Sequence, residues 1–417
     1  MIFSLTSFIW PALGTLILLC YIFKNFKNTE HKNLKSLIFS LALIFAMFGY
    51  CMSFNGKEND LTRYYDTINL MKDNSLLELL KNDDQMLYSK DILFYIVKMS
   101  GNVNLLAFLV GLIIYSITFY VLFDMVKRSN RKFKTYEIFL MGLFCVGILS
   151  PYRIICNVRC VLSYIIMSFA IYRDLVQKKK NIWTILLYII PLGLHSSAII
   201  ILLIRFLSIL FKKLSIVAIS IALFLPKIID FIHFNINFGG SSIGRMISNA
   251  VNKSYYYLHW TEGGWATEVE NALSSKFFRF TGAIFLISIL FIILFSYYKD
   301  YKKKKEIKND NMINYLLFIS VIALGTLSIK TGAFWRFESI VVLFSPVIFV
   351  RLLENKNNFN KIIPYFYIFG IIHFLINILF QINNLTGVGF ITTIQKFLTT
   401  SFIEVLYSFV KGLLNLF

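Results

Sequence analysis

Long, continuously apolar segments recur along the whole chain, and they constrain its fold more than any other feature of the sequence. They lie near residues 3–23, 36–54, 103–125, 136–149, 151–172, 182–194, 196–211, 214–232, 277–298, 312–330, 333–352 and 362–380. A transmembrane helix needs about 20 apolar residues, whereas a strand of a membrane barrel needs about ten residues of alternating polarity. The sequence therefore predicts an all-α polytopic membrane protein with about 12 (11–14) transmembrane helices. A further apolar stretch, residues 397–417, carries Glu404 and Lys411 and is either an interfacial helix or a thirteenth span.

The composition supports this fold class. Of the 417 residues, 57% are hydrophobic and 15% are charged, whereas a soluble domain has about 45–50% apolar and about 25% charged residues. A water-soluble enzyme is therefore excluded. We expect residues 1–417 to form a single membrane-embedded domain. The N-terminal segment is expected to stay as the first span, because it has neither the basic flank nor the cleavage motif of a signal peptide.

The formal net charge of +20 comes largely from clusters of lysine and arginine in alternate loops. The clusters lie in residues 24–35, 126–135, 173–181, 299–311 and 353–361. This alternation is what the positive-inside rule produces, so we expect these loops in the cytoplasm. The long loops 55–102 and 233–276 are then external. Nucleic-acid binding is not expected, because no aromatic stacking platforms are interleaved with the basic residues.

Two apolar segments, residues 136–149 and 182–194, are too short to cross the hydrocarbon core of a membrane. The joins that follow them, at Ser150-Pro151 and at His195-Ser196, are then expected below the outer membrane surface. Irregular backbone at that depth is tolerated only against protein or a water-filled cavity. We therefore expect short or re-entrant helices around an outward-facing cavity.

Four polar groups near the outer ends of these segments are candidate functional sites, because ionisable residues in a membrane are costly and are commonly functional. The first contains Arg153, Asn157 and Arg159, which follow Ser150-Pro151. If a span begins at Pro151, its positive N-terminal dipole and two guanidinium groups form an anion site. Arginine suits bidentate binding of phosphate, and the alternative is that these arginines extend to lipid headgroups.

The second and third groups each leave two interpretations open. His195 opens the segment His195-Ser196-Ser197 and is either a proton-transfer residue or a hydrogen-bonded core residue. Arg336 starts a later span and is either a second phosphate ligand or the partner of Glu338 or of a carbonyl.

The fourth group lies in the first external loop, where Asp60 precedes Arg63 and Tyr64. Asp60 is either chemically active or the N-cap of the helix that begins there. The second external loop combines glycines, which favour mobility, with clustered aromatic residues. Those aromatic residues either bind sugars or form an interfacial belt.

Motifs for nucleotide or metal chemistry are missing from the sequence. It has no P-loop, GxGxxG, HExxH or acidic DxD pattern, and its five cysteines form no CxxC pair. We therefore expect no metal, no cofactor and a substrate carrier other than a nucleotide.

Four segments recur in the same order in EpsG-like members of the Wzy-type polysaccharide polymerases. They are Asn59-Asp60-Leu61-Thr62-Arg63-Tyr64-Tyr65, Asn157-Val158-Arg159, Gly193-Leu194-His195-Ser196-Ser197-Ala198 and Arg336-Phe337. The chain thus resembles this family over about residues 50–350. Cys160 stands where EpsG-like sequences often have glutamine.

This resemblance implies a glycosyltransferase of the bacterial cytoplasmic (inner) membrane, related in type to GT-C-like enzymes, with its active site facing outward. The growing O-antigen, capsule or exopolysaccharide chain would pass from undecaprenyl diphosphate to the non-reducing end of the next lipid-linked repeat unit. The base would be His195 or Asp60. The residues that would bind the substrate or its diphosphate are Arg159, Arg336, Arg153, Arg63, Asn157, Tyr64 and Ser196.

The expected partners are the lipid-linked oligosaccharide, the bilayer, a chain-length regulator and a flippase. Two other functions stay open. One is an O-antigen ligase or another lipid-linked glycosyltransferase, and the other is a flippase for the lipid-linked oligosaccharide. A flippase is expected to contain internal repeats, and no repeat is visible in this sequence.

Overall fold

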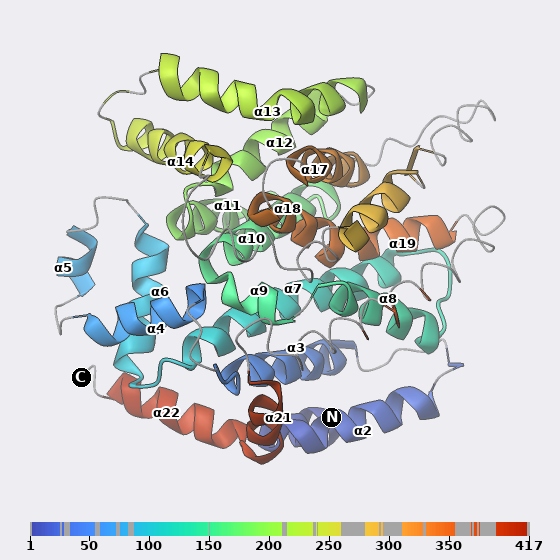
Figure 1. Ribbon diagram of the computed structural model, residues 1–417. Coiled ribbons are helices and arrows are strands. Elements are labelled where there is room, and N and C mark those ends of the chain that lie inside the picture. The colour runs from blue at the N-terminus through green and yellow to red at the C-terminus, as the bar shows by residue number, and fades with distance from the viewer. Residues whose placement is uncertain are drawn as a thin grey trace. The chain divides into compact units, whose positions relative to one another are not determined.

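The computed structural model is all-helical over the residues that it describes (Figure 1). These are residues 2–25, 27–28, 34–54, 59–71, 76–81, 87–149, 151–210, 215–236, 239, 241–259, 280–291, 293–294, 311–327, 331–354, 368, 371–372, 375 and 389–414. The chain divides into two compact units. The first comprises residues 1–82, 90–162 and 343–417, and the second comprises residues 83–89 and 163–342. The prediction of a single domain stays a prediction.

The first unit is built around one long helix, α7 (Leu105–Arg128). Its 24 residues extend over about 36 Å, enough to cross a membrane. It is the one described helix that meets this criterion by both length and composition, so the predicted number of spans stays a prediction. α3 (Leu34–Tyr50) packs along α7. Glycine allows the close approach, because a Cβ atom on Gly111 would lie 3.2 Å from the Cα atom of Ala46.

The other helices of the first unit surround this pair. α8, α9 and α19 pack on α7, and α4 packs on α9. The helices are α1 (Ile2–Ile9), α2 (Pro11–Lys24), α4 (Asp60–Leu70), α5 (Leu76–Lys81), α6 (Tyr88–Met99), α8 (Thr135–Gly147), α9 (Pro151–Cys156), α19 (Ser345–Glu354), α21 (Phe390–Thr399) and α22 (Phe402–Leu414). The first two residues of α6 belong to the second unit, and α10 (Val158–Leu175) begins in the first unit and ends in the second.

Two of the segments that the sequence predicts as single spans are each divided into two helices next to a proline. Residues 3–23 form α1 and α2, which break at the extended residue Trp10, and residues 333–352 break at Phe344. Proline explains both breaks, because it lacks an N–H donor and its ring clashes with a preceding helical turn. Pro11 is the first residue of α2, and Pro346 is the second residue of α19.

The C-terminal segment also differs from a span. α22 has 13 residues and is about 20 Å long, less than the thickness of the hydrocarbon core. Phe402 packs on Phe8 with ring centroids 4.6 Å apart, while Tyr407 and Leu414 are exposed. The structure therefore favours the amphipathic helix over a thirteenth span.

The second unit includes the two short segments at whose junction His195 lies. α11 (Ile182–Leu194) has 13 residues, as has α8 in the first unit, so both predicted short helices are confirmed. The remaining helices are α12 (Ala198–Leu210), α13 (Ser215–Asn235), α14 (Ser242–His259), Phe280–Phe291, α17 (Asn311–Leu327) and α18 (Thr331–Leu343). α17 packs on both α12 and α13.

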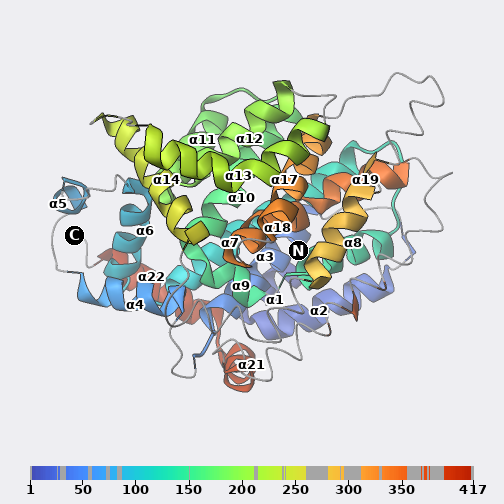
Figure 2. The ribbon, with the colours of Figure 1, turned by 45° about the horizontal axis from the view of Figure 1, so that its top comes forward.

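The predicted external loop 233–276 is partly helical. α14 occupies residues 242–259 and runs beside α13 (Figure 2). The ring of Tyr255 stacks on His233 with centroids 4.0 Å apart. The predicted loop therefore contains a helix, and Tyr255 of its clustered aromatic residues lies on that helix. Residues 260–276, and nearly all of the predicted span 362–380, lie outside the described residues.

Candidate functional site

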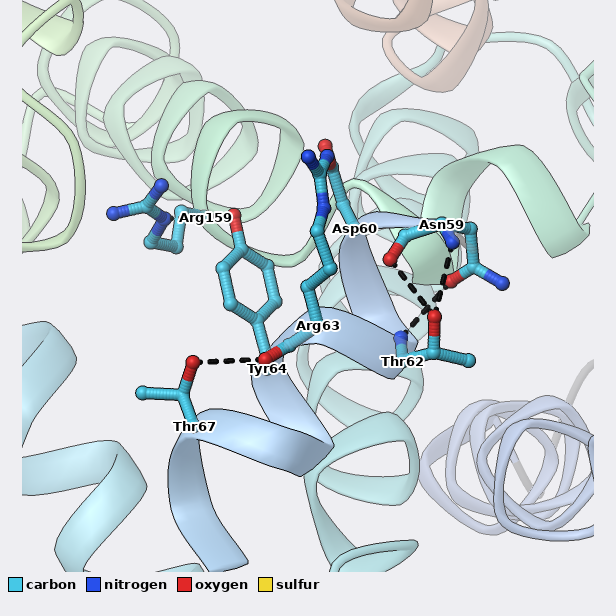
Figure 3. A network of polar contacts seen from close by, with 7 residues as sticks. All are labelled: Asn59, Asp60, Thr62, Arg63, Tyr64, Thr67 and Arg159. Atoms are coloured by element: carbon cyan, nitrogen blue, oxygen red, sulfur yellow. Dashed lines mark hydrogen bonds and ion pairs between the residues drawn. The ribbon is translucent and has the colours of Figure 1, made fainter. Parts of the chain in front are cut away.

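The candidate site of the first unit begins with the N-terminus of α4. Asn59 is the N-cap, and its side-chain oxygen accepts a hydrogen bond from the Thr62 N–H at 3.0 Å. The Asn59 N–H in turn donates to Thr62 Oγ1 at 2.9 Å, which completes a capping box (Figure 3). The prediction that Asp60 caps this helix is wrong, because Asn59 holds the extended conformation that a cap requires.

Asp60 is consequently the first helical residue, and its carboxylate pairs with Arg63 one turn later. The two side chains are 30% and 58% exposed. An exposed ion pair stabilises a protein by only about 0–1 kcal/mol. The main consequence of this ion pair is that Asp60 and Arg63 each already have a counter-charge.

Arg159, the second residue of α10, is held by Tyr64. Its Nε–H donates to the Tyr64 hydroxyl at 2.8 Å, and its Cζ atom lies 4.9 Å from the centroid of the Tyr64 ring. The Tyr64 ring packs on Phe94 of α6 with centroids 5.5 Å apart. Figure 3 shows the terminal nitrogens of Arg159 on the side away from the Tyr64 hydroxyl. Tyr64 therefore orients the guanidinium and leaves its fork open.

No carboxylate of the described residues lies within ion-pair distance of Arg159, although its side chain is half-buried. A charge partly removed from water and left without a counter-charge costs free energy. An anion that binds to the two terminal nitrogens removes this cost, and the planar fork fits phosphate oxygens. The arrangement can therefore bind a phosphate group.

The predicted helix that starts at Pro151 and carries both Arg153 and Arg159 is wrong, because the chain breaks at Asn157. The Asn157 side-chain N–H donates to the Arg153 carbonyl oxygen at 2.9 Å. The Asn157 carbonyl oxygen accepts from the Val161 N–H at 3.0 Å. Asn157 thus ends α9 and begins α10, which is a structural role. Arg153 stays half-buried on α9, the helix against which α4 packs, while Ser150 lies outside the described residues.

Tyr65 adds a hydroxyl that the sequence did not single out. Its oxygen is buried and has no hydrogen-bond partner among the described residues. Burial raises the pKa of Tyr65 well above its usual value, with smaller contributions from Cys156 and Tyr50. The group therefore stays neutral and able to donate. The adjacent motif Tyr64-Tyr65 was the available signal in the sequence.

A second candidate group lies in the second unit, where His195 joins α11 to α12 as predicted. The His195 Nδ1 atom lies 2.6 Å from Ser197 Oγ, and the Tyr164 hydroxyl donates to the same Ser197 oxygen at 3.0 Å. All three side chains are buried. Ser196 is also buried, and its hydroxyl has no partner among the described residues. Sequence reasoning missed Tyr164, whose signal was a hydroxyl on an apolar helix five residues after Arg159.

Arg336 is half-buried on α18, and the next residue, Phe337, packs on Tyr164 with ring centroids 5.8 Å apart. Glu338 is buried, and a Cβ atom on Gly282 would overlap its carboxylate. The predicted roles of Arg336, as a phosphate ligand or as the partner of Glu338 or of a carbonyl, stay predictions. Arg159 belongs to the first unit and Arg336 to the second, so their joint grip on a diphosphate also stays a prediction.

A buried ion pair in the second unit was missed by sequence reasoning. Arg205 of α12 pairs with Asp174 of α10, and its Nε–H donates to the Tyr188 hydroxyl at 3.2 Å. Arg205 interrupts an otherwise apolar segment, which is the usual sequence signal for a functional residue in a membrane. Because its charge is balanced by Asp174, we assign it a structural role. Among the described residues, no cluster of His, Cys, Asp and Glu could hold a metal ion.

The sequence profile of the EpsG family matches residues 36–392, which cover most of the chain, so the protein belongs to the EpsG family. The match includes every candidate residue from Asp60 to Arg336. No curated protein and no solved structure matches the chain. Membership in this family indicates a membrane protein of exopolysaccharide biosynthesis.

Proposed function

We propose that this EpsG-family protein is a polysaccharide polymerase on the outer face of the bacterial cytoplasmic membrane. It transfers a growing glycan from undecaprenyl diphosphate to the non-reducing end of a lipid-linked repeat unit. The observation that carries this proposal is the guanidinium of Arg159, oriented by Tyr64 and without a carboxylate partner in the described part of the chain. A departing diphosphate requires such a fixed positive charge.

The hydrogen bond from Arg159 to Tyr64 lowers the cost of binding. Because Nε and one face of the guanidinium are already held, less side-chain freedom is lost when the fork binds phosphate. Arg153 on the adjacent helix adds positive charge. Arg63 contributes less, because Asp60 already neutralises it.

In the proposed reaction, a hydroxyl oxygen of the acceptor sugar forms a bond to the anomeric carbon of the growing glycan. The bond from that carbon to the diphosphate oxygen breaks, and its electron pair leaves with undecaprenyl diphosphate. A base takes the proton of the acceptor hydroxyl. Asp60 and His195 are the two candidates for this base. A flippase and a chain-length regulator are the expected partners.

Glycan chain length in a strain that lacks this protein tests the function. We expect single repeat units on the surface, and full-length chains after complementation with the wild-type gene. Full-length chains that stay unattached would indicate a ligase instead, and an absence of surface repeat units would indicate a flippase.

Cysteine labelling tests the outward location of the Arg159 site. In a cysteine-free background, Asp66→Cys on α4 should react with a membrane-impermeant maleimide on intact cells. Lys132→Cys in the predicted cytoplasmic loop should react only after permeabilisation. Both residues are exposed. The reverse pattern would place the Arg159 site on the cytoplasmic face and contradict the proposal.

A further inference from the structure

We infer that the turn between α10 and α11, residues 176–181, binds the headgroups of acidic phospholipids, and that Trp183 fixes α11 at the same level of the membrane. The turn belongs to a loop that the charge pattern predicts to be cytoplasmic. The inference concerns the bilayer, so it does not depend on the proposed polymerase activity.

Three consecutive lysines, Lys178 to Lys180, are the binding groups of this turn. All three are exposed, and none of them has an ion-pair partner among the residues that the structure describes. The nearest acidic residue along the chain, Asp174, is buried and pairs with Arg205. The three positive charges are therefore available to an external anion.

Hydrogen bonds hold the backbone of this turn in one conformation. The Lys179 N–H donates to the Arg173 carbonyl oxygen at 3.0 Å, and the Thr184 hydroxyl donates to the Lys179 carbonyl oxygen at 2.8 Å. The Arg173 guanidinium donates to Thr184 Oγ1 at 3.2 Å and to Asn181 Oδ1 at 3.3 Å. Arg173 also adds a fourth positive charge beside the lysines. Because the turn is already ordered, little backbone entropy is lost when an anion binds.

The backbone of Lys178 supports a role for its side chain. Its φ of 59° lies in the left-handed region, and it is the one non-glycine residue with a positive φ in the described part of the chain. Glycine adopts this conformation without strain, whereas a residue with a Cβ atom rarely does. Such conformations are concentrated at ligand-binding and other functional positions.

The start of α11 indicates that the anion belongs to a membrane. The exposed residues of this helix are all apolar, and they are Ile182, Trp183, Ile185, Leu186, Ile189 and Ile190. The helical repeat places them on one side of α11. Trp183 is 66% exposed in the first turn, and its ring suits the boundary between hydrocarbon and headgroups. A free phosphate would explain the lysines but not this apolar face.

An anchor at Trp183 limits the depth that His195 can reach. His195 ends α11 as its C-cap. From Trp183 to His195 the helix rises by at most about 18 Å, and any tilt of α11 reduces this distance. The hydrocarbon core is about 30 Å thick. With Trp183 at one boundary of the hydrocarbon, His195 is therefore held inside the membrane, short of the opposite surface.

Spin labels along α11 test this anchor in lipid nanodiscs. In a cysteine-free background, Ile182→Cys, Ile185→Cys and Ile189→Cys place labels on the exposed face, and Lys179→Cys places one in the turn. We expect collisions with oxygen to increase from residue 182 to residue 189, over at most about 10 Å of depth. The label at residue 179 should collide mainly with a water-soluble nickel complex.

Two outcomes of the labelling would contradict the anchor. Access of the nickel complex to all three positions on α11 would show that this face meets water. An immobilised label at residue 189 would show that another protein surface, rather than lipid, covers it.

Quenching by brominated lipids tests the lysines, with a fluorophore attached at Ile182→Cys in mixed bilayers. We expect brominated phosphatidylglycerol, which is acidic, to accumulate near residue 182 more than brominated phosphatidylcholine, which has no net charge. Replacing Lys178, Lys179 and Lys180 together by glutamine should lower this preference about tenfold, and so should high ionic strength. Equal quenching by the two lipids in the wild type would overturn the inference.

A matched variant separates this turn from the net charge of the protein. Lys127, Lys132 and Lys134 are also exposed, and they lie in another loop that the charge pattern predicts to be cytoplasmic. Replacing them together by glutamine removes the same charge and should leave the lipid preference at residue 182 within about twofold of wild type. A loss as large as that of the first triple variant would mean that the preference comes from net charge alone, and the binding role of the turn would be rejected.

Discussion

Two half-buried arginines of the first unit, Arg131 and Arg159, lie equally close to aromatic rings but differ in their counter-charges. The Cζ atom of Arg131 lies 4.9 Å from the Phe133 ring centroid, and the Cζ atom of Arg159 lies 4.9 Å from that of Tyr64. Arg131 also pairs with the carboxylate of Glu137. Arg159 has the neutral hydroxyl of Tyr64 instead.

The partners of Arg131 explain its role. Its Nη1–H donates to the Leu353 carbonyl oxygen at 3.1 Å, and Glu137 also accepts the Lys134 N–H at 2.8 Å. Arg131 thereby ties the loop before α8 to the end of α19. Stacking on a ring thus does not distinguish a structural arginine from a ligand-binding one. The lack of a carboxylate partner among the described residues does distinguish them, because binding of an anion then recovers electrostatic free energy.

The largest expected effect follows from removing the charge of Arg159. Arg159→Ala should lower the polymerisation rate by at least about 10²-fold, because a fixed donor to the departing charge is lost. Arg159→Lys should recover little of it, since a lysine has no fork. The rate is measured with the purified protein and a lipid-linked repeat unit, at matched protein abundance. Normal glycan length in the lysine variant would show that fork geometry is irrelevant.

Arg131→Ala should lower the stability of the protein and leave its polymerisation rate unchanged. Removing it leaves Glu137 without its counter-charge, which should cost roughly 3 kcal/mol of stability, as for other buried pairs. Thermal unfolding in detergent measures this loss, and the rate per folded molecule should stay at the wild-type level. A rate loss comparable to that of Arg159→Ala would end the distinction between the two arginines.

Tyr64→Phe sharpens the comparison, because it makes the ring under Arg159 the same as the ring under Arg131. The ring contact remains and the hydrogen bond to Nε is lost. A hydrogen bond to a charged group contributes about 1.5–3 kcal/mol, so we expect roughly a tenfold or larger loss of undecaprenyl diphosphate affinity. Phe133→Leu is the control and should leave that affinity unchanged. Wild-type affinity in Tyr64→Phe would remove Tyr64 from the binding site.

The smallest expected effect belongs to Arg63. Because Asp60 neutralises it and both are exposed, Arg63→Ala should change stability by about 0–1 kcal/mol and activity by no more than a few-fold. Asp60→Asn is measured in the same assay, and an unchanged rate would exclude Asp60 as the base. A loss of 10²-fold in Asp60→Asn would instead support Asp60 as the base.

Features that depend only on residues close together in the sequence were predictable from it. The lengths of α8 and α11 and the position of His195 between α11 and α12 follow from where apolar runs stop. The breaks at Trp10 and Phe344 were missed, although Pro11 and Pro346 signal them. The choice of Asn59 over Asp60 as the N-cap was not predictable, because both residue types cap helices well and only the backbone conformation decides.

The sequence alone established an apolar, helical protein of the EpsG type with arginines, a histidine and hydroxyls near the ends of its segments. The free energy of transfer from water to an apolar medium is a property of each single residue. Summing it along the chain is therefore enough to locate the apolar segments. Each arginine also has a hydrogen-bond partner far away in the sequence. Tyr64 is 95 positions from Arg159, and Leu353 is 222 positions from Arg131. Only the tertiary structure brings such partners within bonding distance. It also shows that Arg131 pairs with Glu137, whereas no carboxylate of the described residues pairs with Arg159.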